Sequence, residues 1–299
     1  MDRFESMSAF VAVTEAGGFS AAARKLGMPL ATVSRKVSEL EDLLKISLIN
    51  RSTRKITLTE NGQTFYESCR RLLDELGEAE RSASGEYQAP RGELIITAPI
   101  VFGRMHLTPI VVEFLGTYPE VGVRLLLDDQ IVNLIDEQVD LAVRISELPD
   151  SSMVAVRIGT IRNVICASPA YLKKHGTPRH PKDLANHHCV TRTKLAMHGT
   201  WPFRIGDTEK MFPVRRRLVV TAAEAAIEAA LAGAGLARVL CYQIAKAEKE
   251  GALITVLRDY EPAPTPISLV YPSTRMVPLK LRAFLDFAVP RLRERLKQL

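Results

Sequence analysis

The sequence predicts an α/β protein in three parts: a small helical domain at residues 1–60, a long linker helix at 61–88 and a two-lobed α/β domain at 89–299. Three observations predict it. Short helical patterns separated by glycines fill the first sixty residues, a long apolar stripe at helical spacing follows, and strand-like and helical segments then alternate. With 299 residues, of which 46% are hydrophobic and 25% charged, the chain can bury two or three domain cores.

The first sixty residues contain the parts of a helix-turn-helix. An amphipathic first helix ends at Gly17-Gly18, and Ser20 is expected to cap a second helix lined with alanine. Gly27 closes that helix in a tight turn, and Pro29 opens a third helix that runs to about Leu40. Small residues at the helix contact allow close approach, which is typical of a helix-turn-helix.

Charge is concentrated in the same region. Phe19 to Thr57 contains eight Lys and Arg against three Asp and Glu, while the whole chain has a net charge of +6. Such clustering is typical of phosphate binding. The stretch 50–59 is polar and basic and then alternates, which predicts a two-stranded wing carrying Arg51, Arg54 and Lys55 toward DNA. A solvated basic loop is the alternative.

The order of certain residues indicates a family. They are Phe10, Gly18-Phe19-Ser20-x-Ala22-Ala23, Leu26, Val33-Ser34-Arg35, Val37, Leu40-Glu41, Leu48, Arg51 and Leu58-Thr59-x-x-Gly62. By them the segment 4–62 resembles the DNA-binding domain of LysR-type transcriptional regulators, and the remaining chain fits that family's layout. The resemblance implies a winged helix-turn-helix, a dimerising linker helix and a periplasmic-binding-protein-like effector domain. It also implies a sequence-specific regulator whose promoter contacts respond to a small molecule bound in the C-terminal domain.

The start of the third helix departs from the family pattern. Many members carry Ser and Gln there, whereas this chain has Pro29, Leu30, Ala31 and Thr32. These side chains can contact thymine methyl groups but cannot form a bidentate bond to adenine. Ser34 and Arg35 are therefore the favoured base or phosphate contacts, with Ser20 as a further DNA-binding candidate.

The linker helix is predicted from one apolar stripe: Phe65, Cys69, Leu72, Leu73, Leu76 and Ala79. A stripe beyond the DNA-binding core needs a partner surface, so self-association as a homodimer or homotetramer is favoured, as the resemblance also implies. Packing of the stripe onto its own domain is the alternative. Residues 85–92, which include Pro90, indicate a hinge.

The C-terminal part is predicted as two βαβ-type lobes. Strands at 94–98, 123–127 and 141–144 alternate with helices at 99–115 and 131–137, as in an open parallel sheet. A second unit begins with strand 163–167 and contains helix 222–232 and strand 236–240. With strand 267–271 and helix 279–296, the first lobe covers about 92–161 and 267–299, and the second about 162–266.

Ligands of open α/β sheets bind beyond the carboxyl ends of strands, where helix N-termini favour anions. The candidate effector residues at such ends are Thr97, Ala98, Pro99, Ile100, Val101, Ser168 and Thr191. Plain turns are the alternative at each position. An effector with an anionic group is favoured, whereas the nearby Arg144 and Arg192 are expected to be solvated or ion-paired.

Other classes fit less well. Gly233-x-Gly235 precedes a strand and is only half of a dinucleotide fingerprint, and His187-His188-Cys189 has no known metal spacing. With no G-x-S-x-G or H-E-x-x-H motif either, we expect no enzyme activity, metal or cofactor. A solute-binding protein would share the two lobes but would carry a signal peptide and lack the basic domain.

Location follows from what the sequence contains. The N-terminus has acidic residues and no apolar signal-peptide region, and no apolar run was found that is long enough to span a membrane. The four cysteines are far apart, which is typical of reduced thiols in a cytoplasmic protein. The expected partners are therefore double-stranded operator DNA, a small-molecule effector and further copies of the same chain.

Overall fold

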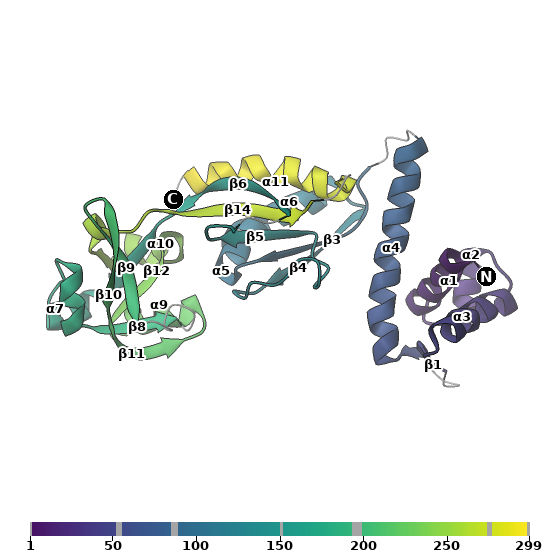
Figure 1. Cartoon of the computed structure of the whole chain (residues 1–299), viewed down its shortest axis with the longest axis horizontal. Coiled ribbons are helices and arrows are strands. Elements are labelled where there is room, and N and C mark those ends of the chain that lie inside the picture. Colours follow the sequence, from purple (N-terminus) through teal and green to yellow (C-terminus); the bar gives the residue numbers. More distant parts are fainter. Residues whose placement is uncertain are drawn as a thin grey trace. The chain divides into compact units, whose positions relative to one another are not determined.

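Figure 1 shows the protein as a computed structural model, which describes residues 2–51, 56–84, 89–149, 152–192, 199–273 and 277–297. Backbone contacts divide the chain into two units, Met1–Ala89 and Pro90–Leu299. Each unit has its own hydrophobic core. The predicted hinge at 85–92 lies partly outside the described residues.

The N-terminal unit is a winged helix-turn-helix followed by a long helix. Its elements are α1 (Arg3–Glu15), α2 (Phe19–Leu26), α3 (Leu30–Leu44), β1 (Ile49–Arg51), β2 (Ile56–Leu58) and α4 (Glu60–Ser84). The strands pair antiparallel, with Ile49 opposite Leu58. The core contains Phe10, Val33 and Val37, each fully buried, and Ala22 allows α2 to pack closely on it.

The α4 stripe divides between two environments. Phe65 packs on Phe10 of α1 with ring centroids 6.0 Å apart, Cys69 is fully buried, and Leu73 packs on the same core. The alternative that the stripe packs on its own domain therefore accounts for these three residues. Leu72, in contrast, is 43% exposed, and Leu76 is half-buried.

The C-terminal unit contains two five-stranded sheets, which we call the first and second lobes. The first sheet has the order β4-β3-β5-β14-β6 and the second β11-β8-β12-β7-β13. The first-lobe strands are β3 (Gly92–Ala98), β4 (Val121–Leu127), β5 (Leu141–Ile145), β6 (Met153–Ile161) and β14 (Thr265–Pro272). The second-lobe strands are β7 (Asn163–Ala167), β8 (His188–Arg192), β11 (Arg215–Val220), β12 (Leu236–Leu240) and β13 (Ile254–Val256).

Both sheets are mixed, which corrects the prediction of an open parallel sheet. In the first, β3 is parallel to β4 and β5, but β14 is antiparallel to β5 and β6. In the second, β8 is parallel to β11 and β12, but β7 is antiparallel to β12 and β13. The antiparallel strands are those beside the two places where the chain crosses between lobes, at 162 and at 257–264.

Helices cover the sheets. The first lobe carries α5 (Ile100–Phe102), the π-helical turn η1 (Gly103–Leu107), α6 (Thr108–Thr117) and α11 (Leu279–Lys297), which lies along β6 and β14 in Figure 1. The second carries α7 (Pro169–His175), the 3-10 turn η2 (Pro181–Asn186), α9 (Ala223–Leu231), α10 (Cys241–Lys249) and the 3-10 turn η3 (Arg258–Tyr260), together with the hairpin β9 (Thr200–Ile205) and β10 (Thr208–Pro213).

One segment corrects the expectation that no run could span a membrane. Ile100–Thr117 has a mean hydropathy of 1.2 over 18 residues, which is long and apolar enough by composition alone. However, Phe114 of this segment is fully buried, and its ring lies 5.0 Å from that of Phe284 on α11. The apolar character of the segment is therefore explained by packing in the core of the lobe.

The helix predicted at 131–137 is absent, because the described backbone there forms turns. The Asn133 side chain accepts a hydrogen bond from the Ile135 N–H at 3.1 Å, which favours a turn over a helix. Gln138 has a φ of 54°, a left-handed conformation that also stops a helix. Ile131 and Ile135, the apolar pair that predicted the helix, are 73% and 61% exposed.

Candidate DNA interface and effector site

The turn between α2 and α3 is built by Gly27. Its φ of 63° is left-handed, and the next N–H, that of Met28, donates to the Ala23 carbonyl at 3.0 Å. The Pro29 carbonyl then accepts the N–H groups of Thr32 and Val33, which starts α3. Ser20 does not cap α2, which corrects that expectation: the cap position is Gly18, and Ser20 is an exposed residue in the first turn.

The third helix presents one exposed face. Val33, Val37 and Leu40 are buried against the core, whereas Leu30 is 48% exposed, Ala31 and Arg35 are exposed, and Thr32 and Ser34 are half-buried. Residues four apart share a helix face, so Leu30 lies beside Ser34 and Ala31 beside Arg35. The residues predicted to contact DNA on this helix therefore form a continuous surface at its N-terminal half.

Arg35 already has an ionic partner on its own helix. Its guanidinium Nη1 lies 3.2 Å from the Glu39 carboxylate, and the Arg35 side chain is 67% exposed. An exposed i,i+4 pair of this kind is worth only about 0–1 kcal/mol. A phosphate or a guanine edge can therefore compete with Glu39 for the guanidinium.

The wing is held by a set of hydrogen bonds that explains the Leu58-Thr59-x-x-Gly62 motif. The Thr59 hydroxyl donates to the Ser47 carbonyl at 2.8 Å and accepts the Gly62 N–H at 2.9 Å, so Thr59 caps α4. A Cβ on Gly62 would lie 2.0 Å from the Leu48 carbonyl oxygen, which leaves room only for glycine. The Glu41 carboxylate accepts the N–H of Leu48 at 2.8 Å and fixes the start of β1.

Of the predicted wing contacts, Arg51 ends β1, and Arg54 and Lys55 lie outside the described residues.

Most of the predicted effector residues are buried. Thr97, Ala98, Val101 and Thr191 are 1–3% exposed, and Ala98 and Val101 belong to the hydrophobic core. Ala98 would meet a Cβ built on Gly103 at 3.4 Å, so a bulky side chain at position 98 would disturb core packing. Pro99 and Ile100, at the start of α5, are half-buried.

An internal carboxylate occupies the helix start where an anionic ligand was expected. The Asp129 carboxylate of the first lobe accepts the Ile100 N–H at 3.2 Å. Its other oxygen lies 2.6 Å from the Arg192 guanidinium, at the end of β8 in the second lobe. Arg192 is thus ion-paired, as expected, and Arg144 donates to the Val132 carbonyl at 2.7 Å. Asp129 was missed by the sequence analysis, although Asp128-Asp129 follows a predicted strand end.

The same junction contains buried polar atoms without partners. Thr191 Oγ1 and Arg192 Nε make no hydrogen bond to the described residues, and neither does His106 Nε2 of the first lobe. The His106 ring lies 5.1 Å from that of Tyr242 on α10, and burial lowers the pKa of His106. These polar atoms from both lobes are the groups a polar ligand would satisfy.

Ser168 is placed differently. Its hydroxyl accepts the Tyr171 N–H at 3.4 Å and caps α7, and a Cβ on Gly233 would lie 3.7 Å from that hydroxyl. No hydrogen bond joins Ser168 to Thr97–Val101 or Thr191 within the part of the chain that is described. The structure therefore brings Ile100 and Arg192 together through Asp129 and leaves Ser168 as a helix cap.

The four cysteines are free and buried. Burial raises the pKa of Cys69, Cys166 and Cys189 to about 12, so these thiols are protonated at neutral pH. Among the described residues no group of three His, Cys, Asp or Glu is arranged to hold a metal ion.

A winged helix-turn-helix joined to a two-lobed α/β domain defines a class of DNA-binding regulators that respond to small molecules. Residues 4–63 match the model of the bacterial regulatory helix-turn-helix protein, lysR family, and residues 87–293 match the LysR substrate binding domain. The chain belongs to the LysR family: it is a DNA-binding transcription regulator with an effector-binding domain.

Relatives agree over nearly the whole chain. An HTH-type transcriptional regulator of Xanthomonas campestris pv. campestris (strain 8004) is 38% identical over 95% of this chain and 83% of its own length. The regulator CrgA of Neisseria meningitidis serogroup C (strain 8013) is 34% identical over 96% of both chains.

Solved structures show the same fold. CrgA from Neisseria meningitidis, a LysR-type transcriptional regulator, has a TM-score of 0.62, with 33% identity over 96% of this chain and 98% of its own. The Vibrio cholerae virulence activator AphB, a member of the LTTR family, has a TM-score of 0.61, with 28% identity over 96% of this chain and 98% of its own.

Proposed function

We propose that the exposed N-terminal half of α3 reads the operator, with Arg35 as its principal polar contact and Leu30, Ala31 and Thr32 contacting thymine methyl groups. The observation that supports this most is the separation of faces on α3, because Val33 and Val37 fix the helix on the core while Arg35 stays 67% exposed. A helix held in this way fits the major groove, and its free side chains meet base edges.

Regulation is proposed to act between the two lobes. An anionic effector would compete with the Asp129 carboxylate for the Arg192 guanidinium and the Ile100 N–H, which are already arranged around a negative charge. The unpartnered Thr191 Oγ1 beside them offers a further polar contact. Exchanging an internal carboxylate for a ligand changes an interlobe contact, and this is a means of shifting the population of lobe arrangements.

Self-association is proposed through α4. Leu72 is exposed and Leu76 half-buried, one helical turn apart, next to the part of the stripe that packs inward. A second copy that covers these side chains would remove them from water. Two copies would place two α3 helices on successive turns of the duplex.

The DNA proposal is tested by comparing Arg35→Ala with Arg204→Ala, which makes the same charge change at an exposed residue of the β9–β10 hairpin. Fluorescence anisotropy with duplex DNA selected by the full chain gives the dissociation constants. Arg35→Ala is expected to weaken binding by about 1–3 kcal/mol, and Arg204→Ala to leave it unchanged. Equal affinities for both variants and the parent would remove Arg35 from the interface.

A further inference from the structure

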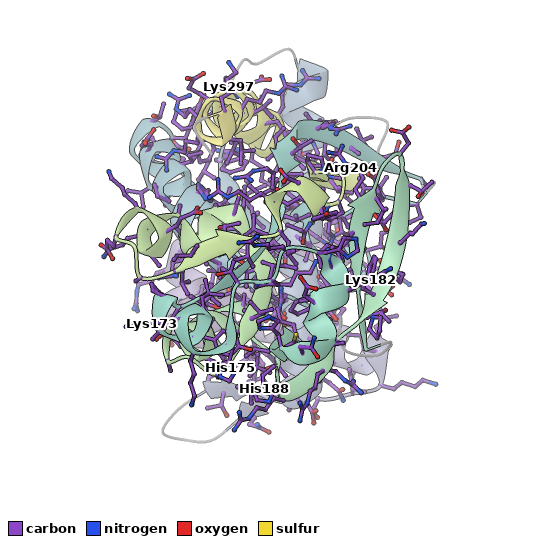
Figure 2. All side chains as sticks on the ribbon, turned by 90° about the vertical axis from the view of Figure 1, so that its left-hand side faces the viewer. Lys173, His175, Lys182, His188, Arg204 and Lys297 are labelled. Carbon is purple, nitrogen blue, oxygen red and sulfur yellow. The ribbon has the colours of Figure 1, made fainter. Side chains whose placement is uncertain are left out.

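A separate pocket lies in the second lobe, on one face of its sheet. It measures about 210 Å³ and is lined by residues of β7, β9, β12 and β13 and of the segment after η3. Ile165 and Val256 in its wall belong to the same core as Phe203, whereas their sequence neighbour Cys166 packs in the core that contains α9. The pocket therefore lies on the sheet face opposite α9. Figure 2 shows this lobe, with Arg204 labelled on the β9–β10 hairpin.

The base of the pocket is a row of cross-strand neighbours. Arg238 of β12 lies opposite Ile165 of β7, and Ile165 lies opposite Val256 of β13. Directly paired residues in antiparallel strands point to the same face, so the Arg238 side chain lies beside two aliphatic ones. Pro202 and Phe203 of β9 line the pocket as well. One guanidinium thus faces a pocket whose walls are mostly apolar.

The charge of Arg238 has no partner within reach. Its guanidinium makes no hydrogen bond and no ion pair with the described residues, and burial lowers the pKa of Arg238 to about 10. Glu261, which also lines the pocket, is held by Arg162, whose Nη1 lies 3.1 and 3.2 Å from its two oxygens. Glu209 favours the charged form of Arg238 but lies beyond ion-pair distance.

A buried, unpaired cation is unfavourable, and an anion that binds beside it offsets the lost hydration. A carboxylate matches the planar guanidinium with two parallel hydrogen bonds. We propose that this pocket binds a small carboxylic acid with an apolar body, whose carboxylate pairs with Arg238 and whose hydrocarbon part lies against Phe203 and Val256. This site is distinct from the interlobe site at Asp129 and Arg192 and does not depend on it.

The pocket borders both chain crossings between the lobes. Asn163 directly follows the first crossing, and Glu261 and Pro262 lie on the second. The crossings are tied to each other, because Asn163 Nδ2 donates to Thr265 Oγ1 at 2.9 Å and Arg162 pairs with Glu261. A bound acid would contact both connecting segments and is positioned to influence how the lobes move relative to one another.

The chain provides its own probe of this pocket. Trp201 is the single tryptophan, is fully buried, and directly precedes Pro202 in the pocket wall. Its indole N–H gives one resonance in an NMR spectrum of the full-length protein. The titrants are sodium butyrate and sodium benzoate, with butyramide and sodium chloride as neutral and ionic controls.

The variants are Arg238→Met, which keeps most of the side-chain length without the charge, and Arg192→Met, which alters the interlobe site. Butyrate or benzoate is expected to shift the Trp201 resonance saturably, with a Kd of about 1 mM or below, in the parent and in Arg192→Met. Arg238→Met should abolish the shift, with its melting temperature showing that it is folded.

Three results would overturn the proposal: no saturable shift in the parent, an equal shift with butyramide, or a shift that persists in Arg238→Met. Binding that is lost only in Arg192→Met would instead place the acid between the lobes. Because the two variants address different sites, failure of the pocket and failure of the interlobe effector site are distinguishable.

Discussion

The carboxylate of Asp129 and the guanidinium of Arg192, 2.6 Å apart, join the two lobes of the effector domain by an ion pair. Both side chains are about one-fifth exposed, and the second carboxylate oxygen accepts the Ile100 N–H that begins α5. The helix start that an external anion would use is thus already neutralised from within. The Arg104 guanidinium, 3.9 Å from Glu224, makes a second and more exposed contact between the lobes.

Asp129→Asn should destabilise the protein by about 1–2 kcal/mol, because it leaves the partly buried Arg192 guanidinium without a counter-charge. Urea unfolding of the full chain measures the change. In the Arg192→Met background the same substitution should cost clearly less, since the partner is already gone. Additive costs in this double-mutant cycle would show that the two groups do not interact in solution.

Glu39→Gln should tighten DNA binding several-fold, because it releases the Arg35 guanidinium from its 3.2 Å partner and removes a negative charge from the recognition helix. Asp42→Asn is the matched control: it makes the same charge change at an exposed position of α3. Anisotropy titrations at one salt concentration compare the two. If Asp42→Asn tightens binding as much as Glu39→Gln, the Arg35–Glu39 pair has no specific role.

Leu72→Glu combined with Leu76→Glu should dissociate the oligomer without unfolding the N-terminal unit, because the inward-packed Phe65 and Cys69 are untouched. Sedimentation equilibrium gives the mass. Asn61→Glu with Thr64→Glu, at two exposed positions of the same helix, controls for added charge. A Leu72/Leu76 double variant that retains the mass of the parent would place self-association elsewhere.

Sequence periodicity predicted the elements that have one buried face or are buried on both faces. The strands at 163–167 and 236–240 have the observed bounds, and the helix at 279–296 is one residue shorter than α11. It missed β10 and β11, whose residues are nearly all exposed and so do not alternate. It also placed a helix at 131–137, where Asn133 and Gln138 favour turns.

The candidate sites were predictable to different degrees. The face of α3 follows from its spacing, since Val33 and Val37 had to point inward. The interlobe pairing of Asp129 with Arg192 joins residues 63 positions apart. Such a pairing depends on tertiary packing, which no local pattern encodes. For the same reason Ala98 and Val101 were expected to contact a ligand, whereas the structure buries them in the core.

The central claim, that α3 reads DNA with Arg35 and does so in two symmetry-related copies, is tested most directly by selection from random duplex DNA. The parent full-length chain should enrich a two-fold symmetric sequence whose half-sites are about one helical turn, or a multiple of it, apart. Arg35→Ala should enrich the same sequence with the preference relaxed at one symmetry-related pair of positions. An unchanged preference at every position in Arg35→Ala, or a parent consensus without two-fold symmetry, would contradict the account.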